Sequence, residues 1–262
     1  MTDSTMKERR NSWWKLPAAI VFWIAVWQAV SMLVAQELLV PAPLAVLKVL
    51  WRLAGTAVFW QSIGLSMLRV VAGFLLALLC GSLFAVLTER FALADALLSP
   101  MLRLIRAVPV ASFIILALVW LKSTLLPAFI AWMMVTPMVW ENVRQGIRQT
   151  DRQLLEMARV YRFGRWRTFL RVRVPSVLPY FLAACTTGLG FAWKSAIAAE
   201  VISRPAVSIG RRLQDAKVYL ETPELFAWTA VVIVCSLLLE KLFVFLVRRG
   251  GRSFLRRGRG EN

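Results

Sequence analysis

Runs of about 20 consecutive apolar residues recur along this chain of 262 residues. An α-helix of that length crosses the hydrocarbon core of a bilayer, about 30 Å thick, and pairs all of its own backbone polar groups. The prolines Pro109, Pro127 and Pro137 interrupt two of the runs and make those two the least regular. We therefore expect an all-α fold, a polytopic membrane helical bundle. Its six predicted transmembrane helices are residues 16–36, 65–88, 99–121, 124–145, 177–200 and 225–247.

The loops between these runs differ in their content of basic residues. The chain has 32 Lys and Arg against 14 Asp and Glu, a net charge of +18. In a soluble protein this balance would suggest nucleic acid, but in a membrane protein basic residues gather in cytoplasmic loops, beside anionic lipid. With a cytoplasmic N-terminus, and with charges at span ends assigned to the adjoining loop, the inner segments hold 23 Lys and Arg and the outer loops seven. The asymmetry predicts that both termini are cytoplasmic, with membrane lipid and not nucleic acid as a partner.

The predicted spans and their orientation divide the chain into three parts. Residues 1–15 form a basic cytoplasmic N-terminus, residues 16–247 the transmembrane domain, and residues 248–262 a basic cytoplasmic tail. The first apolar run is too long for a signal peptide and lacks a small-x-small cleavage site, so we expect it to remain as the first span. A short amphipathic segment over residues 43–53 is expected on the membrane surface.

Residue types needed for most catalytic centres are missing or isolated. The chain has no histidine, which is the commonest metal ligand and general base. Its cysteines, Cys80, Cys185 and Cys235, each lie inside an apolar run, where a thiol behaves as a small hydrophobe. The sequence therefore predicts no disulfide framework, no metal site and no enzymatic activity.

Two of the runs carry a small residue at every fourth position. The first stripe is Gly73, Ala77, Gly81 and Ala85, and the second is Ala184, Gly188, Ala192 and Ala196. This spacing places each stripe on one helical face, where neighbouring backbones approach closely. The stripes predict either helix packing within the chain or a seam between two subunits.

The segment over residues 146–174, between the fourth and fifth runs, is too long for a simple connector. Thr150 or Asp151 is suited to cap a helix, which would carry an apolar stripe at Leu154, Ala158 and Tyr161. Gly164 offers a turn, and a second, basic helix follows until Pro175 ends it. The pattern predicts a cytoplasmic helix-turn-helix; an amphipathic helix on the lipid surface fits the same periodicity.

This segment resembles the cytoplasmic signature of ABC-importer permeases, which reads Glu-Ala-Ala, three residues, Gly, nine residues, Ile, one residue, Leu-Pro. The positions that match, or that carry Val for Ile or Leu, are Glu156, Ala158, Val172, Val174 and Pro175. Met157 replaces the middle alanine. Arg162 stands where the family has glycine, with Gly164 two residues later.

Further motifs extend the resemblance over roughly residues 40–250. They are similar to the branch that imports nitrate, sulfonate, taurine and bicarbonate, and they occur in the same order: Leu68-Arg-Val-Val-Ala-Gly-Phe, Ser99-Pro, Arg106-Ala-Val-Pro, Asp151-x-x-Leu-Leu-Glu, Arg165-Trp, Leu178-Pro-Tyr and Ala199-Glu.

The resemblance implies a multi-pass permease of the bacterial inner membrane that works as a dimer. Two ATPase subunits would bind ATP, and a solute-binding protein would deliver a small, anionic cargo such as a sulfonate or nitrate. The residues implied in coupling to the ATPase are Glu156, Ala158, Arg162, Gly164 and Pro175. The chain itself has no Gly-x-x-x-x-Gly-Lys-Ser/Thr loop, as expected of a permease whose ATP is bound by a partner subunit. A vitamin-precursor cargo is the alternative within the family.

One basic residue, Lys194, lies inside a span and is a candidate for the substrate pathway. At about 100° per residue, Thr187 and Gly190 share its helical face, and an ionisable group inside a span is costly unless it has a function. Two other interpretations stay open: the side chain snorkels to the outer surface, or an acid such as Glu200 neutralises it. An ion-gradient-driven transporter is the rival class, but no acid occupies a mid-span position.

Overall fold

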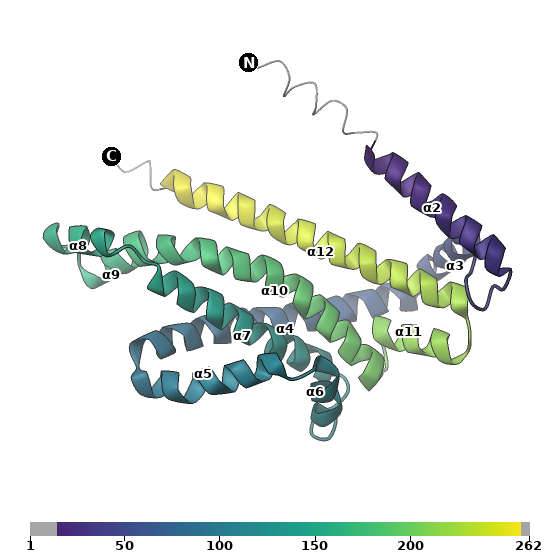
Figure 1. Cartoon of the computed structure of the whole chain (residues 1–262), viewed down its shortest axis with the longest axis horizontal. Helices are drawn as coiled ribbons and strands as arrows, with labels where there is room; N and C mark the ends of the chain where they lie inside the picture. Colours follow the sequence, from purple (N-terminus) through teal and green to yellow (C-terminus); the bar gives the residue numbers. More distant parts are fainter. Residues whose placement is uncertain (1–14, 258–262) are drawn as a thin grey trace, which may run out of the picture. The chain divides into compact units, whose positions relative to one another are not determined.

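A computed structural model describes residues 15–257, with side chains described over residues 17–245 (Figure 1). Residues 1–14 of the predicted basic N-terminus (1–15) and the side chains of the tail at 248–262 therefore lie outside the described residues. Within the described range every regular element is a helix, which confirms the all-α class. In chain order the helices are α2 (Lys15–Val34), α3 (Pro43–Ala54), α4 (Ala57–Arg90), α5 (Ala92–Ala107), α6 (Val110–Ala117), α7 (Leu126–Arg148), α8 (Arg152–Val160), α9 (Arg165–Thr168), the π-helix η1 (Phe169–Arg173), α10 (Val174–Ser203), α11 (Ile209–Val218) and α12 (Thr222–Arg257).

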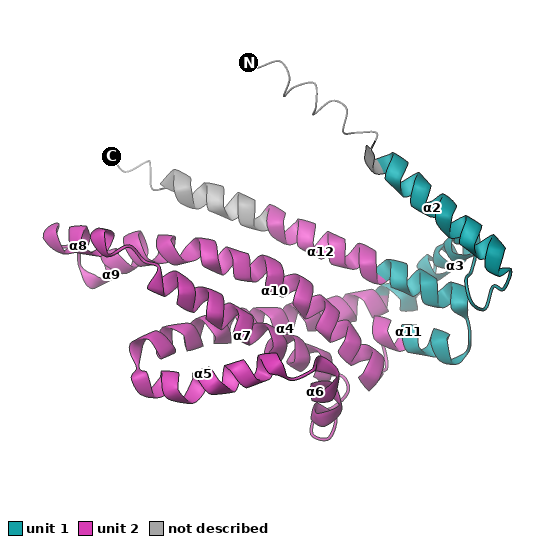
Figure 2. Cartoon of the chain, in the orientation of Figure 1, with its two compact units in different colours: residues 1–60, 212–231 teal, residues 61–211, 232–262 magenta. Residues whose placement is uncertain are grey.

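The chain divides into two compact units (Figure 2). The first comprises residues 1–60 and 212–231, and the second comprises residues 61–211 and 232–262. Within the first unit, the Thr222 hydroxyl donates to the Leu38 carbonyl at 2.7 Å, and the rings of Phe59 and Trp228 lie 5.1 Å apart. All of the candidate functional residues belong to the second unit.

Helix α7 is the centre of the second unit, and the small-residue stripes of α4 and α10 are buried. A Cβ added at Gly73 on α4 would lie 2.3 Å from the Ala128 carbonyl oxygen of α7. One added at Gly188 on α10 would lie 3.0 Å from Val135 Cγ1, also of α7. The alanines of both stripes are fully buried: Ala77, Ala85, Ala184, Ala192 and Ala196. The stripes thus serve helix packing within this chain, the first of the two interpretations.

Four described helical segments are long and apolar enough to cross a membrane, and a bent pair makes a fifth candidate. The four are residues 17–34, 57–90, 165–203 and 222–245. The prediction that six segments cross with both termini inside stays a prediction.

The segment expected to span the membrane over 99–121, one of the two with interrupting prolines, is broken into two helices. Helices α5 and α6 are separated by Val108 and Pro109 and are bent by 106°. Pro109 has no N–H to continue the helical bonds, and its ring forces Val108 into the extended region, with φ −80° and ψ 133°. In contrast, α7 continues through Pro137 and carries Pro127 in its first turn, where a missing N–H costs nothing.

Candidate functional site

Helix α8, the first helix of the predicted coupling segment, begins as expected. Asp151 is its N-cap, and the carboxylate accepts a hydrogen bond from the Gln153 backbone N–H at 2.8 Å. Ala158 is the buried side chain of this helix, whereas Glu156 is exposed. The signature alanine therefore packs inward and the signature glutamate is available to a partner.

The turn after α8 is centred on Arg162 and not on Gly164. Arg162 adopts the left-handed conformation, with φ +52°. Its N–H donates to the Arg159 carbonyl at 2.9 Å and the Phe163 N–H donates to the Ala158 carbonyl at 2.8 Å, which is the Schellman pattern of a helix C-terminus. Gly164 has φ −61° and is the N-cap of α9. The left-handed residue thus occupies the glycine position of the signature, and the prediction of the turn at Gly164 is wrong by two residues.

Pro175 does not end the second helix of the segment, contrary to prediction. The helical path is continuous from Arg165 to Ser203 and includes the π-turn η1 (Figure 1). The Val174 N–H donates to the Phe169 carbonyl, five residues back. Because a proline ring clashes with the carbonyl four residues before it, the wider π-turn is the local adjustment that lets the helix pass Pro175.

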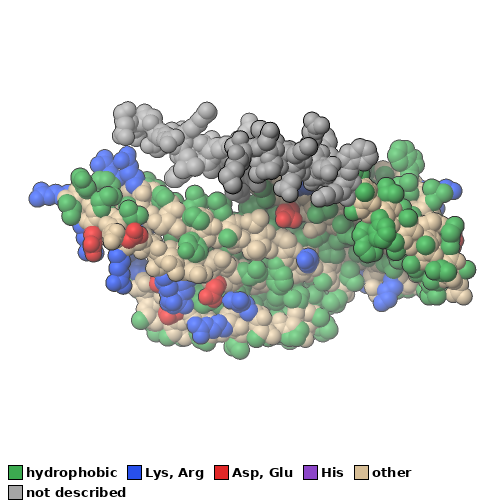
Figure 3. Space-filling view, turned by 45° about the horizontal axis from the view of Figure 1, so that its top comes forward, with side chains coloured by type: hydrophobic (Ala, Val, Ile, Leu, Met, Phe, Trp, Pro, Cys, Tyr) green, Lys and Arg blue, Asp and Glu red, His purple; other side chains and the backbone are tan. Residues whose placement is uncertain are grey.

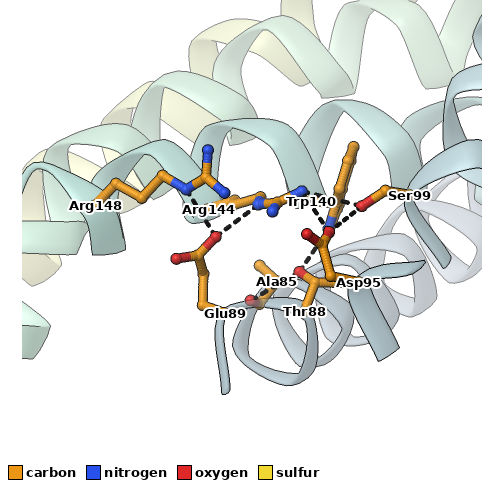
Figure 4. A network of polar contacts seen from close by, with 8 residues as sticks. All are labelled: Ala85, Thr88, Glu89, Asp95, Ser99, Trp140, Arg144 and Arg148. Atoms are coloured by element: carbon orange, nitrogen blue, oxygen red, sulfur yellow. Dashed lines mark hydrogen bonds and ion pairs between the residues drawn. The ribbon is translucent and has the colours of Figure 1, made fainter. Parts of the chain in front are cut away.

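A polar network lies where α7 leads into this segment (Figure 4). The Arg144 guanidinium, 8% exposed, donates to Glu89 Oε1 at 2.6 Å, to Asp95 Oδ1 at 2.9 Å and to Ser99 Oγ at 3.0 Å. It also lies 5.2 Å from the centre of the Trp140 ring. The network joins the end of α4 and the start of α5 to the last turns of α7, directly before the coupling segment.

Sequence reasoning missed this network. It assigned Arg144 to a cytoplasmic loop, and it used Ser99-Pro as a motif without a role. The signal was present in that motif, since the Ser99 hydroxyl donates to Asp95 and accepts from Arg144. Basic side chains also gather on the face of the second unit near α8 and α9 (Figure 3), in keeping with the charge of the segment.

The predicted pathway residues share one uncovered face of α10. Thr187 and Lys194 are exposed and Gly190 is half-buried, whereas the small-residue stripe on the same helix is buried. Among the described side chains, Lys194 has no hydrogen bond or ion pair. Glu200 is engaged elsewhere, so the interpretation that it neutralises Lys194 is wrong.

Glu200 pairs with Arg69, the other basic residue inside a predicted span. Arg69 Nη1 lies 3.0 Å from Glu200 Oε1, and the two side chains are 14% and 1% exposed. The two motifs Leu68-Arg and Ala199-Glu, which are 131 residues apart, meet in this pair. Local sequence patterns gave no sign of it.

Comparisons with known proteins point to one family of membrane proteins. The family model described as binding-protein-dependent transport system inner membrane component matches residues 73–253. The chain is 28% identical over 250 residues to the putative aliphatic sulfonates transport permease protein SsuC of Bacillus subtilis, covering 92% of this chain and 87% of that protein. It is 29% identical over 191 residues to the bicarbonate transport system permease protein CmpB of Synechocystis sp., covering 72% and 67%.

Among solved structures, the fold is similar to one described as an amino acid ABC transporter with histidines. The TM-score is 0.61 at 18% identity, over 73% of this chain and 94% of that chain.

Proposed function

The chain belongs to the family of binding-protein-dependent transport system inner membrane components, and we propose that it carries a small anionic solute inward in response to ATP-driven movements of α8. It is a multi-pass inner-membrane protein and the permease subunit of an ABC importer. The family is one of transport permeases and not of enzymes, and it implies an ATPase and a solute-binding protein as partners. The proposed assembly has two copies of this chain and two ATPase subunits, which bind the ATP.

Helix α8 is the proposed contact with the ATPase. Its carboxyl end carries exposed apolar side chains at Met157, Val160 and Tyr161 beside the exposed Glu156. Exposed apolar groups next to a charge are typical of a surface that a partner covers. The helix is capped at Asp151 and closed by the turn at Arg162, so this surface is held in a defined shape.

The test is the substitution Glu156→Lys. We expect it to abolish uptake and co-purification of the ATPase while the chain still inserts into the membrane. Gln145→Lys, which introduces the same cationic side chain at an exposed position on α7, is the matched control and should leave both unchanged. Normal uptake by Glu156→Lys would exclude α8 as the coupling contact.

The proposed orientation places both termini and residues 146–174 in the cytoplasm and residues 201–222 outside. The asymmetry of basic residues supports it. A single cysteine at position 160, in a chain without Cys80, Cys185 and Cys235, should react with an impermeant reagent only after the membrane is opened. Labelling from outside would refute the orientation.

Lys194 is the proposed attraction point for an anionic cargo. Its charge lies on the uncovered face of α10 without a described partner, and a cation within a membrane span favours an anion. The names of the relatives, which mention sulfonates and bicarbonate, support an anionic class. The exact cargo would be identified by measuring which ligand the partner binding protein holds; a neutral vitamin precursor would redirect the proposal within the same family.

Lys194→Met tests this role because it keeps the approximate length and removes the charge. Uptake at limiting substrate should fall at least tenfold, whereas assembly and basal ATPase activity should persist. Thr186→Val, a shape-conserving change on the exposed side of the same helix, is the control. Unchanged transport by Lys194→Met would leave the lysine as a snorkelling residue.

A further inference from the structure

We propose that Arg69 and Glu200 are positioning residues of the transport cycle, which hold the first turn of α11 against α4 and α10 so that these parts move together. The proposal concerns the side of the membrane that receives the cargo, so it rests on the orientation proposed above. Neither residue needs to contact the ATPase or the cargo.

Glu200 is the hub of the contacts. One carboxylate oxygen accepts from Arg69 Nη1 at 3.0 Å, and the other accepts from the Ser66 hydroxyl at 2.7 Å and from the Gly210 backbone N–H at 3.2 Å. A single buried carboxylate on α10 therefore reaches two side chains of α4 and the backbone of α11.

The α4 side chains make a second set of bonds to the same region. Arg69 Nη1 also donates to the Val207 carbonyl at 3.0 Å, and the Ser66 hydroxyl accepts from the Ile209 N–H at 3.0 Å. The approach is close, because a Cβ added at Gly210 would lie 2.4 Å from the Glu200 Cβ. Each of the three helices is thus bound to the other two at one point.

These bonds satisfy backbone N–H groups at the start of α11. The first N–H groups of any helix have no partner within that helix, and here those of Ile209 and Gly210 are satisfied by side chains from α4 and α10. The carboxylate charge also lies at the positive end of the helix dipole. If the start of α11 separated from α4 and α10, the Ile209 and Gly210 N–H groups would both lose their partners, and the Glu200 carboxylate would lose one of its three donors.

A buried ion pair is weak evidence for stability, because apolar residues of similar shape often stabilise a fold equally well. Because such a pair is satisfied only at particular distances and angles, it is better suited to fixing one arrangement of the helices that carry it. Since α10 also carries Lys194, the pair fixes the start of α11 relative to the helix with the proposed pathway face. Helix rearrangements would therefore reach residues 201–211, on the side where a loaded binding protein delivers its cargo.

The experiment uses the complete importer, reconstituted in liposomes with its ATPase and with increasing concentrations of loaded binding protein. Glu200→Gln should lower uptake and the stimulation of ATPase activity by the binding protein at least tenfold, with basal ATPase activity within twofold of the wild type. Glu141→Gln, which removes an ion pair that is half-exposed on both sides, is the control and should change neither.

The double variant Arg69→Met/Glu200→Gln separates positioning from simple charge neutralisation. It leaves no unpaired charge, so assembly should match the wild type, but the bonds to Val207 and Gly210 are lost or weakened and stimulation should stay low. Full recovery of uptake in the double variant would overturn the proposal.

Ser66→Ala is the milder variant if Glu200→Gln fails to assemble. It keeps the ion pair and removes the acceptor of the Ile209 N–H, and it should lower stimulation several-fold with basal activity retained. Equal loss of basal and stimulated activity would show a general folding role and would also overturn the proposal. Failure of the proposed function is distinct, since the wild-type complex itself would then show no ATP-driven uptake.

Discussion

Replacing Gly73 by alanine should destabilise the helix bundle, although alanine is the better helix former. In a helix interior the change from Gly to Ala contributes about 1 kcal/mol of stability. The added methyl group, however, would lie 2.3 Å from the Ala128 carbonyl oxygen and 2.9 Å from Ala131 Cβ. Overpacking of this kind costs roughly 1–3 kcal/mol, and a backbone contact that no rotamer change relieves belongs at the upper end. The net destabilisation is therefore about 2 kcal/mol.

Gly64 provides the matched control because it lies on the same helix, α4, and is exposed. No heavy atom outside its own surroundings lies within 4 Å of a Cβ added there. Gly64→Ala should therefore show only the gain of about 1 kcal/mol from helix propensity. The two alanine variants should differ by about 3 kcal/mol.

The difference can be measured by unfolding each purified variant in mixed detergent micelles and comparing the free energies of unfolding. We expect a lower free energy of unfolding for Gly73→Ala than for the wild type, and a higher one for Gly64→Ala. Equal stability of the two variants, within about 0.5 kcal/mol, would refute the close approach of α4 to α7.

Three further predictions concern the coupling segment and its base. Arg144→Met should lower thermal stability and uptake together, because it leaves two carboxylates without their shared cation. Arg148→Met, which removes a guanidinium that is 59% exposed, should change little. Equal effects of the two substitutions would contradict the importance of the network. Arg162→Gly should relieve a left-handed strain of about 1 kcal/mol and slow hydrogen exchange in α8; faster exchange would be the contrary result. Asp151→Ala should remove the cap, cost about 1 kcal/mol and speed exchange in α8; no change would exclude the cap.

Features fixed by local periodicity or by a single residue type were predictable from the sequence. The amphipathic segment expected over residues 43–53 is α3, Pro43–Ala54, and the first run expected over residues 16–36 is α2, Lys15–Val34. Asp151 caps α8 because a short acceptor side chain directly before the helix is sufficient to bind a free backbone N–H of the first turn. In each case the decisive interactions lie within one or two helical turns.

Features that depend on tertiary partners were not predictable. Arg69 and Glu200 are 131 residues apart, and Arg144 and Glu89 are 55 apart. Charges at span ends were assigned to loops because an isolated charge is costly inside a bundle. That cost is offset only when the fold supplies a partner, which no local pattern reveals. The turn of the coupling segment was likewise expected at Gly164, although backbone hydrogen bonds place the left-handed residue at Arg162.

The helix from Arg165 to Ser203 connects the two proposed functional regions. It has 39 residues and is therefore about 58 Å long. It begins at the coupling segment, carries Lys194 and ends at the Glu200 contacts. The other end of the coupling segment leads from α7, and a Cβ added at Gly146 would lie 3.1 Å from Tyr180 of α10. Because α7 and α10 are this closely packed, a displacement of α8 acts on both helices at once.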